Sequence, residues 1–324
     1  MHKLTAAVIG LLALVTVATA GGAGQKGNLT LVAYSTPREA YGKLIPAFRS
    51  TPAGRDVEFD ESYGSSGEQT RAVIAGLKAD VVALSLEPDM TSLVKAGIVP
   101  RTWNQDAVGG MVTRSVVVFA VREGNPKKIR TWADLVKPGI DVVTPNVQTS
   151  GGAKWNVLAA YGAQRKAGKS HAQAVKYLEK LYDHIVSQDK SAREALQTFI
   201  AGRGDVLLAY ENEAIFARKK DQPVFYVIPK ATIRIENPIA VTRNASSKPA
   251  ARAFVRYLRT RAAQRIFAEN GYRPVVPAAA KGFTFPVRPQ LFTIKYLGGW
   301  AKVDKRFFHP QMGIVTRIQK RNGG

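Results

Sequence analysis

A short Gly-rich segment carries the clearest chemistry in this sequence. Residues 149–155 read TSGGAKW and follow an apolar run at 140–143 and a short turn. Ser150, Gly151 and Gly152 would place one hydroxyl and several backbone N–H groups at the first turn of a helix. Glycine lacks a Cβ, so a ligand can approach its backbone closely, and a helix start has unpaired N–H donors and a partial positive charge. The segment therefore predicts an anion site that needs no formally charged side chain.

Three further segments place polar donors where a strand is expected to meet a helix. They are 34–39 (YSTPRE), 64–67 (GSSG) and 190–193 (KSAR). In open α/β sheets, ligands bind at the carboxyl ends of the strands. Any one of these segments is typical of ordinary helix capping, but four in one chain predict that helix starts converge on an anion. The Ser-containing segments after residue 60 have no Asp or Glu among their central donors, which favours a fully deprotonated anion such as sulfate.

Short apolar strands alternate with helices along the chain, which predicts an α/β fold with mostly parallel sheets flanked by helices. Two long extended segments, 115–121 and 233–241, bracket the middle of the sequence. We expect the chain to cross between two lobes there. Residues 21–114 and 240–324, including a C-terminal tail, would form the first lobe and residues 115–239 the second. A ligand would then bind in the cleft between the lobes.

Helical periodicity is clear in several segments. Residues 38–49, 171–182 and 192–200 carry apolar side chains at helical spacing. Residues 248–268 read as one long helical region. These helices would cover the strands and place the polar segments at their starts.

The N-terminus has the pattern of a secretion signal. Lys3 precedes an almost wholly apolar stretch at 4–17, and residues 18–20 offer a small-residue cleavage site. The stretch is shorter than the roughly 20 residues of a membrane span. We expect residues 1–20 to be removed and the mature chain to be periplasmic. Gly21 stands where a lipid-anchored protein would need Cys, so no lipid anchor is expected.

Composition excludes several kinds of chemistry. The chain contains no cysteine, which rules out disulfides and thiolate metal or redox sites. No metal-binding motif is evident in the sequence, so neither metal nor cofactor is expected. The net charge of +23 suggests nucleic acid, an anionic membrane or small anions as partners. Because the basic residues are scattered and form no stripe with aromatics, we expect a solvated basic surface and no nucleic-acid role. The protein is expected to be a monomer.

Ordered matches over nearly all of the chain after the signal point to a known family. They comprise 62–69 (SYGSSGEQ), 144–146 with 150–156 (TPN and SGGAKWN), 204–206 with 211–214 (GDV and ENEA) and 298–302 (GGWAK). In these segments the chain resembles the periplasmic sulfate-binding protein family, the solute receptors of sulfate/thiosulfate ABC importers. The resemblance implies a type II periplasmic-binding-protein fold, no enzymatic activity, and membrane importer subunits as partners.

The resemblance also implies which residues bind the ligand. They are Ser66, Ser150, Gly151, Gly152, Ala192 and Tyr210. Most would donate a backbone N–H group. Ser150 would supply its hydroxyl as well as its backbone, and the aromatic residue would donate from its side chain.

Two positions depart from the family's pattern. The family usually has Trp where this chain has Tyr210, and a phenol accepts as well as donates hydrogen bonds. Lys154 stands where the family often has Arg, and Lys lacks the planar fork of a guanidinium. Ser35, Thr36, Lys154 and Arg193 are expected to line the site as secondary residues.

Three other functions stay open from the sequence. One keeps the receptor and changes the cargo to phosphate, molybdate or tungstate. An exported hydrolase of sulfate or phosphate esters would need a base beside Ser66 or Ser150, and only His171, His184 and His309 follow the signal. Nucleic-acid binding would rest on net charge alone.

Overall fold

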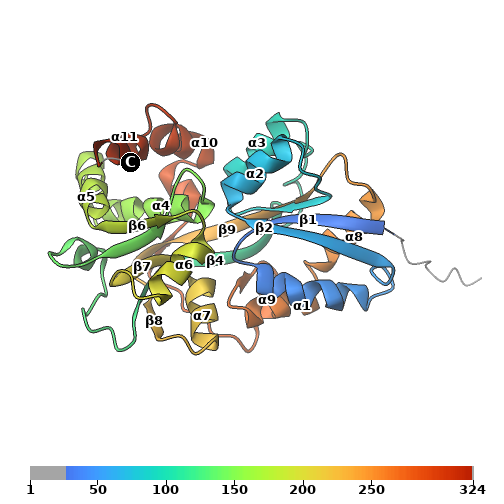
Figure 1. The fold of residues 1–324 in the computed structure, drawn as a ribbon, viewed down its shortest axis with the longest axis horizontal. Helices are drawn as coiled ribbons and strands as arrows, with labels where there is room; N and C mark the ends of the chain where they lie inside the picture. The colour runs from blue at the N-terminus through green and yellow to red at the C-terminus, as the bar shows by residue number, and fades with distance from the viewer. Residues whose placement is uncertain (1–26, 323–324) are drawn as a thin grey trace, which may run out of the picture.

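The computed structural model describes residues 27–322, which form two lobes joined by two long strands (Figure 1). The expected signal peptide at residues 1–20 lies outside the described residues. Within residues 27–322, none of the helices combines the length and hydrophobicity that crossing a membrane requires.

The elements alternate between strand and helix over most of the chain. The strands are β1 (Gly27–Tyr34), β2 (Val57–Gly64), β3 (Val81–Ala83), β4 (Met111–Arg122), β5 (Val142–Pro145), β6 (Ile185–Asp189), β7 (Val206–Tyr210), β8 (Val224–Val227), β9 (Ala231–Val241), β10 (Arg273–Pro274) and β11 (Gln290–Phe292). The α-helices are α1 (Arg38–Arg49), α2 (Ser66–Ile74), α3 (Glu87–Lys95), α4 (Gly151–Lys166), α5 (His171–Asp183), α6 (Ala192–Ile200), α7 (Glu211–Lys219), α8 (Lys248–Tyr257), α9 (Arg261–Glu269), α10 (Trp300–Val303) and α11 (Ile314–Arg321). Short helical turns are η1 (Trp132–Val136), η2 (Pro277–Ala280), η3 (Ile294–Leu297) and η4 (Asp304–Phe308).

One sheet runs through both lobes in the order β2-β1-β3-β9-β4-β7-β5-β6. In the first lobe β1 pairs in parallel with β2 and β3, and in the second β5 pairs in parallel with β6 and β7. The long strands β4 and β9 are antiparallel to each other and to their neighbours β3 and β7. The predicted parallel strands are therefore confirmed in each lobe, and antiparallel pairing is concentrated on the strands that connect the lobes.

The first lobe has its own core. Helix α1 buries Tyr41, Leu44 and Phe48, which recur at helical spacing on one face. Phe48 packs against Phe254 of α8 with ring centroids 5.2 Å apart. The same cluster includes Leu29 and other side chains of the sheet. Burial of this face therefore holds α1 against the sheet.

The C-terminal tail packs on the second lobe, and here the structure differs from the expectation for residues 240–324. Phe292 and Phe307 belong to the same hydrophobic cluster as the residues of α4 and α5. Trp300 stacks edge-on against Trp155 of α4, with ring centroids 4.8 Å apart. Because α4 is apolar nearly all round, it must be covered on its outer side too, and the tail supplies that cover.

The helical region expected at 248–268 is two helices. Thr260 interrupts it, and its side-chain oxygen accepts a hydrogen bond from the backbone N–H of Ala263 at 3.2 Å. This N-cap starts α9 in a new direction.

The packing of the tail predicts a large effect of truncating Phe292, which is 3 % exposed. We expect Phe292→Ala to lower the free energy of unfolding by about 3 kcal/mol, because it opens a cavity beside α4. Urea denaturation measures this. The matched control is Val287→Ala, since Val287 is 78 % exposed and should change stability by less than about 0.5 kcal/mol. Equal small effects would show that the tail is not part of the core.

Candidate functional site

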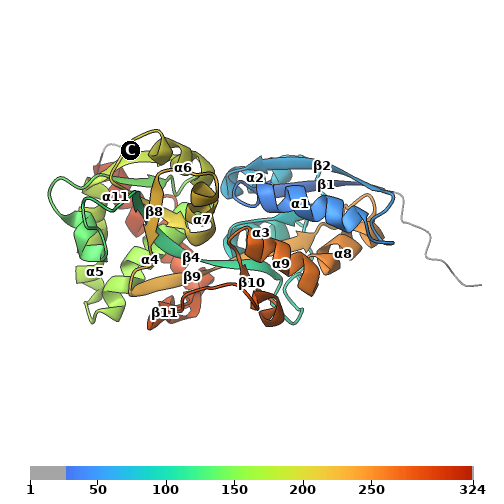
Figure 2. The same ribbon diagram turned by 90° about the horizontal axis from the view of Figure 1, so that it is seen from below.

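Helix starts from both lobes meet across the boundary between them. Figure 2 shows α6 and α7 of the second lobe opposite α1 and α2 of the first. Helices α2, α4 and α6 begin at the polar segments 64–67, 149–155 and 190–193, and α7 begins directly after β7. The N–H groups in the first turn of each helix have no partner within that helix.

Gly152 marks a point where three of these elements meet. A Cβ built on Gly152 would lie 3.3 Å from both the Ala192 Cβ and the Ser150 Oγ. The same position is 3.5 Å from Cε2 of Tyr210. Since glycine leaves this space open, the first-turn amides of α4 are accessible from it. The structure thus brings together four of the residues predicted from the sequence.

Ser85, two residues after the end of β3, connects the first lobe to this point. Its backbone N–H donates to the Oγ of Ser66 at 2.9 Å, and its hydroxyl shares a 2.6 Å hydrogen bond with the phenol of Tyr210. A Cβ on Gly151 would lie only 2.5 Å from the Ser85 Oγ. The lobes are therefore in contact here, and the remaining two predicted residues, Ser66 and Gly151, lie at the same junction.

Two side chains hold Ser85 in position. The indole N–H of Trp155 and the side-chain amide of Asn237 donate to the Ser85 carbonyl oxygen at 3.0 and 2.9 Å. Ser85 is 1 % exposed, so all its polar groups are satisfied within the protein.

The hydroxyl of Ser66 is engaged on both sides. It donates to Oδ2 of Asp89 at 2.5 Å and accepts from the Ser85 N–H. Burial raises the pKa of Asp89, and the hydrogen bond from Ser66 offsets part of that rise. The backbone N–H is therefore the group of Ser66 that remains to bind a ligand.

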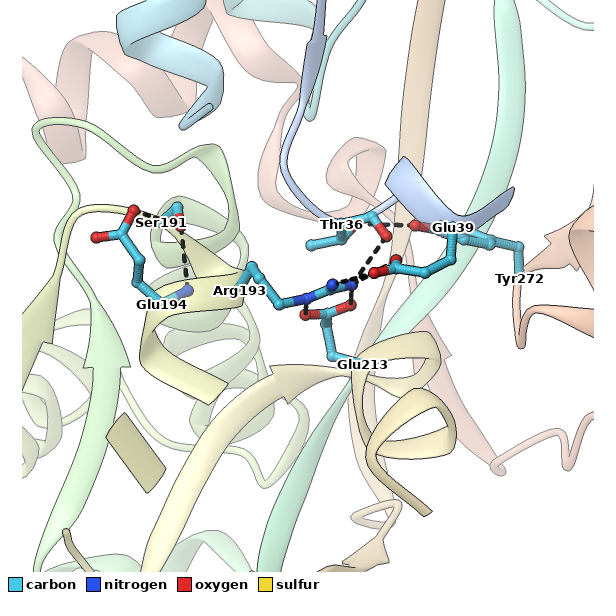
Figure 3. Close-up of polar contacts among 7 residues, drawn as sticks. All are labelled: Thr36, Glu39, Ser191, Arg193, Glu194, Glu213 and Tyr272. Carbon is cyan, nitrogen blue, oxygen red and sulfur yellow. Dashed lines mark hydrogen bonds and ion pairs between the residues drawn. The ribbon is translucent and has the colours of Figure 1, made fainter. Parts of the chain in front are cut away.

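The serines that precede α4 and α6 use their hydroxyls differently. The Ser191 Oγ accepts from the backbone N–H of Glu194 at 3.1 Å (Figure 3). The Ser150 hydroxyl makes no such cap and faces the space beside Gly152. However, the Ser150 backbone N–H donates to the carbonyl of Asn146 at 2.8 Å. The expected backbone contribution of Ser150 is therefore wrong, whereas its hydroxyl is available.

The two cations expected to line the site are paired with carboxylates. Lys154 forms an ion pair with Asp304 of the tail at 3.1 Å. Arg193 lies between Glu39 and Glu213 (Figure 3), with shortest N–O distances of 2.6 and 2.8 Å. Both positive charges are thus compensated inside the protein.

The pKa values around Arg193 reflect this pairing. Burial pushes the pKa of Glu39 upward, but the hydrogen bonds and charge of Arg193 outweigh burial and lower it overall. Burial raises the pKa of Glu213 and Arg193 offsets part of that rise. At neutral pH the cluster holds one guanidinium between two carboxyl groups.

The first-loop residues lie at the edge of the site. The Thr36 hydroxyl hydrogen-bonds the phenol of Tyr272 at 2.9 Å, and its carbonyl accepts from Arg193 at 3.3 Å (Figure 3). Ser35 is half-buried in the same turn. Thr36 therefore connects the lobes, and its hydroxyl is already in use.

A cavity of about 290 Å³ reaches the start of α4 from the boundary between the lobes. Its lining includes Gly67, Arg71, Asp89, Ser150, Gly151 and Lys154. Both lobes contribute polar groups to the wall of this cavity.

The described part of the chain offers no support for hydrolytic chemistry. His171 bonds to Tyr161 and His184 to the Ile140 carbonyl, each at 2.9 Å. Within residues 27–322, no group of three or more His, Cys, Asp or Glu is arranged to hold a metal ion. A nucleophilic serine is typically activated by an adjacent histidine, and these hydrogen bonds of His171 and His184 go to groups other than Ser66 and Ser150.

Comparison with known proteins identifies the family. Residues 29–273 match the family described as bacterial extracellular solute-binding protein. The chain belongs to this family.

Similarity to individual solute-binding proteins extends over most of the chain. The sulfate-binding protein of Synechococcus elongatus is 44 % identical over 301 residues, covering 90 % of this chain and 86 % of the relative. The thiosulfate-binding protein of Escherichia coli is 32 % identical over 315 residues, covering 92 % and 93 %. The solved structure of the sulfate-binding protein SubI from Mycobacterium tuberculosis superposes with a TM-score of 0.85 at 45 % identity, covering 87 % of this chain and 99 % of SubI. The two-lobed α/β fold is therefore that of the solute-binding proteins.

Sequence reasoning missed several residues at the centre of this solute-binding protein. Ser85 contacts Ser66 and Tyr210, which lie 19 and 125 positions away. Asp89 meets Ser66 across 23 positions. A polar residue at the end of the buried run 79–84 was the available signal for Ser85, since strand ends at this edge carry site residues.

Burial raises the pKa of Tyr210 well above its ordinary value near 10, although the hydrogen bond to Ser85 opposes the rise. A raised pKa keeps the phenol neutral and able to donate at alkaline pH. We expect the native protein and Tyr210→Phe to give the same tyrosinate absorbance up to about pH 10.5. If the variant lacks one titrating tyrosine between pH 9 and 10.5, the Tyr210 side chain is not buried as described.

Proposed function

We propose that this solute-binding protein is a receptor for sulfate and, as a second ligand, thiosulfate. It binds the anion between its lobes and delivers it to the membrane subunits of an ABC importer. Its similarity to proteins named sulfate-binding and thiosulfate-binding supports this cargo.

The observation that carries the proposal is the contrast between neutral and charged groups. Unpaired first-turn amides and one unengaged hydroxyl converge near Gly152, whereas Lys154 and Arg193 are paired with carboxylates. Neutral donors at helix starts suit a dianion that keeps no proton.

Each donor has a role in this proposal. Backbone N–H groups of Ser66, Gly151, Gly152 and Ala192 bind the anion, the Ser150 hydroxyl donates, and the Tyr210 phenol completes the shell. This role requires the Ser85 hydroxyl to be the donor in its 2.6 Å hydrogen bond with the Tyr210 oxygen, so that the phenolic proton is left for the ligand. Ser35, Thr36, Lys154 and Arg193 lie outside this first layer.

The number of donors is sufficient for tight binding. A net hydrogen bond to a charged group is worth roughly 1.5–3 kcal/mol. Six such bonds, after desolvation and ordering costs, support a dissociation constant in the micromolar range or lower, about −8 kcal/mol. No metal or cofactor is needed.

The location belongs to the same proposal. Cleavage of residues 1–20 would release a periplasmic monomer, in which residues 27–114 with 240–289 would form the first lobe. The basic surface expected from the net charge of +23 keeps the mature protein in solution and weakly favours anions.

Calorimetry and thermal unfolding with a panel of oxyanions test the function. Sulfate at 100 times its dissociation constant should stabilise the protein by about 2.7 kcal/mol. A larger stabilisation by phosphate, molybdate or tungstate would show that this anion, not sulfate, is the ligand. No stabilisation by any oxyanion would contradict the proposed receptor function.

Gly152→Asp should abolish sulfate binding, because it introduces a carboxylate where the anion would sit. Isothermal titration calorimetry measures the loss. The control is Gly42→Asp, since Gly42 has no other atom within 4 Å of a built Cβ. Native affinity in the Gly152 variant would exclude this location for the anion.

Gly151→Ala should weaken sulfate binding by preventing full closure. The new Cβ would lie 2.5 and 2.7 Å from the Oγ and Cβ of Ser85 in the opposite lobe. We expect a larger radius of gyration than the native protein at saturating sulfate, measured by small-angle X-ray scattering. Gly42→Ala is the control and should match the native protein; if Gly151→Ala also matches it, the lobes do not meet at Gly151.

A further inference from the structure

Arg193 lies at the boundary between the lobes and contacts both (Figure 3). Its Nε and Nη2 donate to the two carboxylate oxygens of Glu213 at 2.8 and 2.9 Å. Its Nη1 and Nη2 donate to the two oxygens of Glu39 at 2.6 and 2.9 Å. The planar guanidinium therefore binds two carboxylates with paired hydrogen bonds, a geometry that Lys cannot reproduce.

The two carboxylates belong to different lobes. Glu213 lies in α7, next to α6 in the second lobe, and its side chain is 1 % exposed. Glu39 lies in the first turn of α1 in the first lobe and is 31 % exposed. The Arg193 guanidinium also stacks on Phe216 of α7, 4.2 Å from the ring centroid. Arg193 is therefore anchored in its own lobe, and Glu39 is the partner that comes from across the cleft.

This arrangement keeps the free-energy cost of separating the lobes low. Opening breaks the bonds from Arg193 to Glu39 and to the Thr36 carbonyl. Glu213 keeps its bonds to Arg193, so the fully buried carboxylate does not lose its partner. A buried charge left unpaired would be strongly destabilising. The pair that breaks is the more exposed one, as a reversible contact requires.

The cluster is unsuited to binding the anion itself. Four of the Arg193 hydrogen bonds go to oxygens of the Glu39 and Glu213 side chains, so these donors are already used. Its position is nevertheless linked to the site. Arg193 directly follows Ala192, and Glu213 comes three residues after Tyr210.

We propose that Arg193 and Glu39 form a latch that holds the lobes closed over the bound anion without touching it. Both are positioning residues. The latch rests on the proposed function for its ligand, and it acts by favouring the closed arrangement over the open one. A contact made only in the closed state raises affinity by increasing the population competent to retain ligand.

Sulfate kinetics in Glu39→Gln test the latch. Glutamine keeps the size of the side chain and removes its charge. We expect the dissociation rate to rise about tenfold with the association rate changed less than about twofold, because losing one partner of a close charge pair acts mainly on dissociation. The preference among oxyanions should not change. Arg193→Lys keeps the charge without the fork and should behave like Glu39→Gln.

Glu58→Gln is the matched control. Glu58 pairs with Arg49 at 2.6 Å within the first lobe, and its side chain is 67 % exposed. This variant should keep native rates. An unchanged dissociation rate in Glu39→Gln, or a change confined to association, overturns the latch.

A second measurement needs no ligand. The radius of gyration of the ligand-free protein, measured by small-angle X-ray scattering, follows the balance between the open and closed arrangements. We expect Glu39→Gln to increase it relative to the native protein and to Glu58→Gln, and equal values overturn the latch. Failure of the native protein to bind sulfate would instead overturn the proposed function alone.

Discussion

An anion removed from water must recover its hydrogen bonds from the protein, and this requirement constrains the whole molecule. The first turn of a helix presents unpaired amides, because no preceding carbonyl is available. A set of such amides meets at one point when several helices begin there. The alternation of strand and helix satisfies this condition, because β2, β5, β6 and β7 end near the same junction and α2, α4, α6 and α7 begin there.

Ser85 links the two lobes at this junction by hydrogen bonds. Its N–H, carbonyl and hydroxyl bond to Ser66, to Trp155 with Asn237, and to Tyr210 respectively. These partners come from both lobes and from a connecting strand. Lys154 and Arg193 are paired with carboxylates, so amide and hydroxyl dipoles at the helix starts contribute strongly to the local field. Selection of the ligand then depends on hydrogen-bond geometry and on whether the ligand carries a proton. A free cation would attract any anion and weaken this selectivity.

The elements with strong local signals were predictable. Helices α1 and α6 begin and end where capping residues and apolar spacing indicated. Strand β6 (Ile185–Asp189) was missed because its half-exposed residues form no apolar run. The tail was expected on the first lobe because aromatic content does not reveal which surface it covers, whereas the packing of Trp300 on Trp155 does. The predicted ligand residues cluster around Gly152, but the hydrogen bond from Ser150 N–H to Asn146 and the role of Ser85 depend on tertiary contacts.

The pairing of β4 with β9 also restricts how the lobes can move. These strands face each other in register from Thr113 and Asn237 to Val116 and Arg234, with an irregularity between Met111 and Thr113. A hydrogen-bonded ribbon flexes perpendicular to its surface but resists sliding of one strand along the other. We therefore expect opening of the lobes to bend this ribbon rather than to slide β4 along β9.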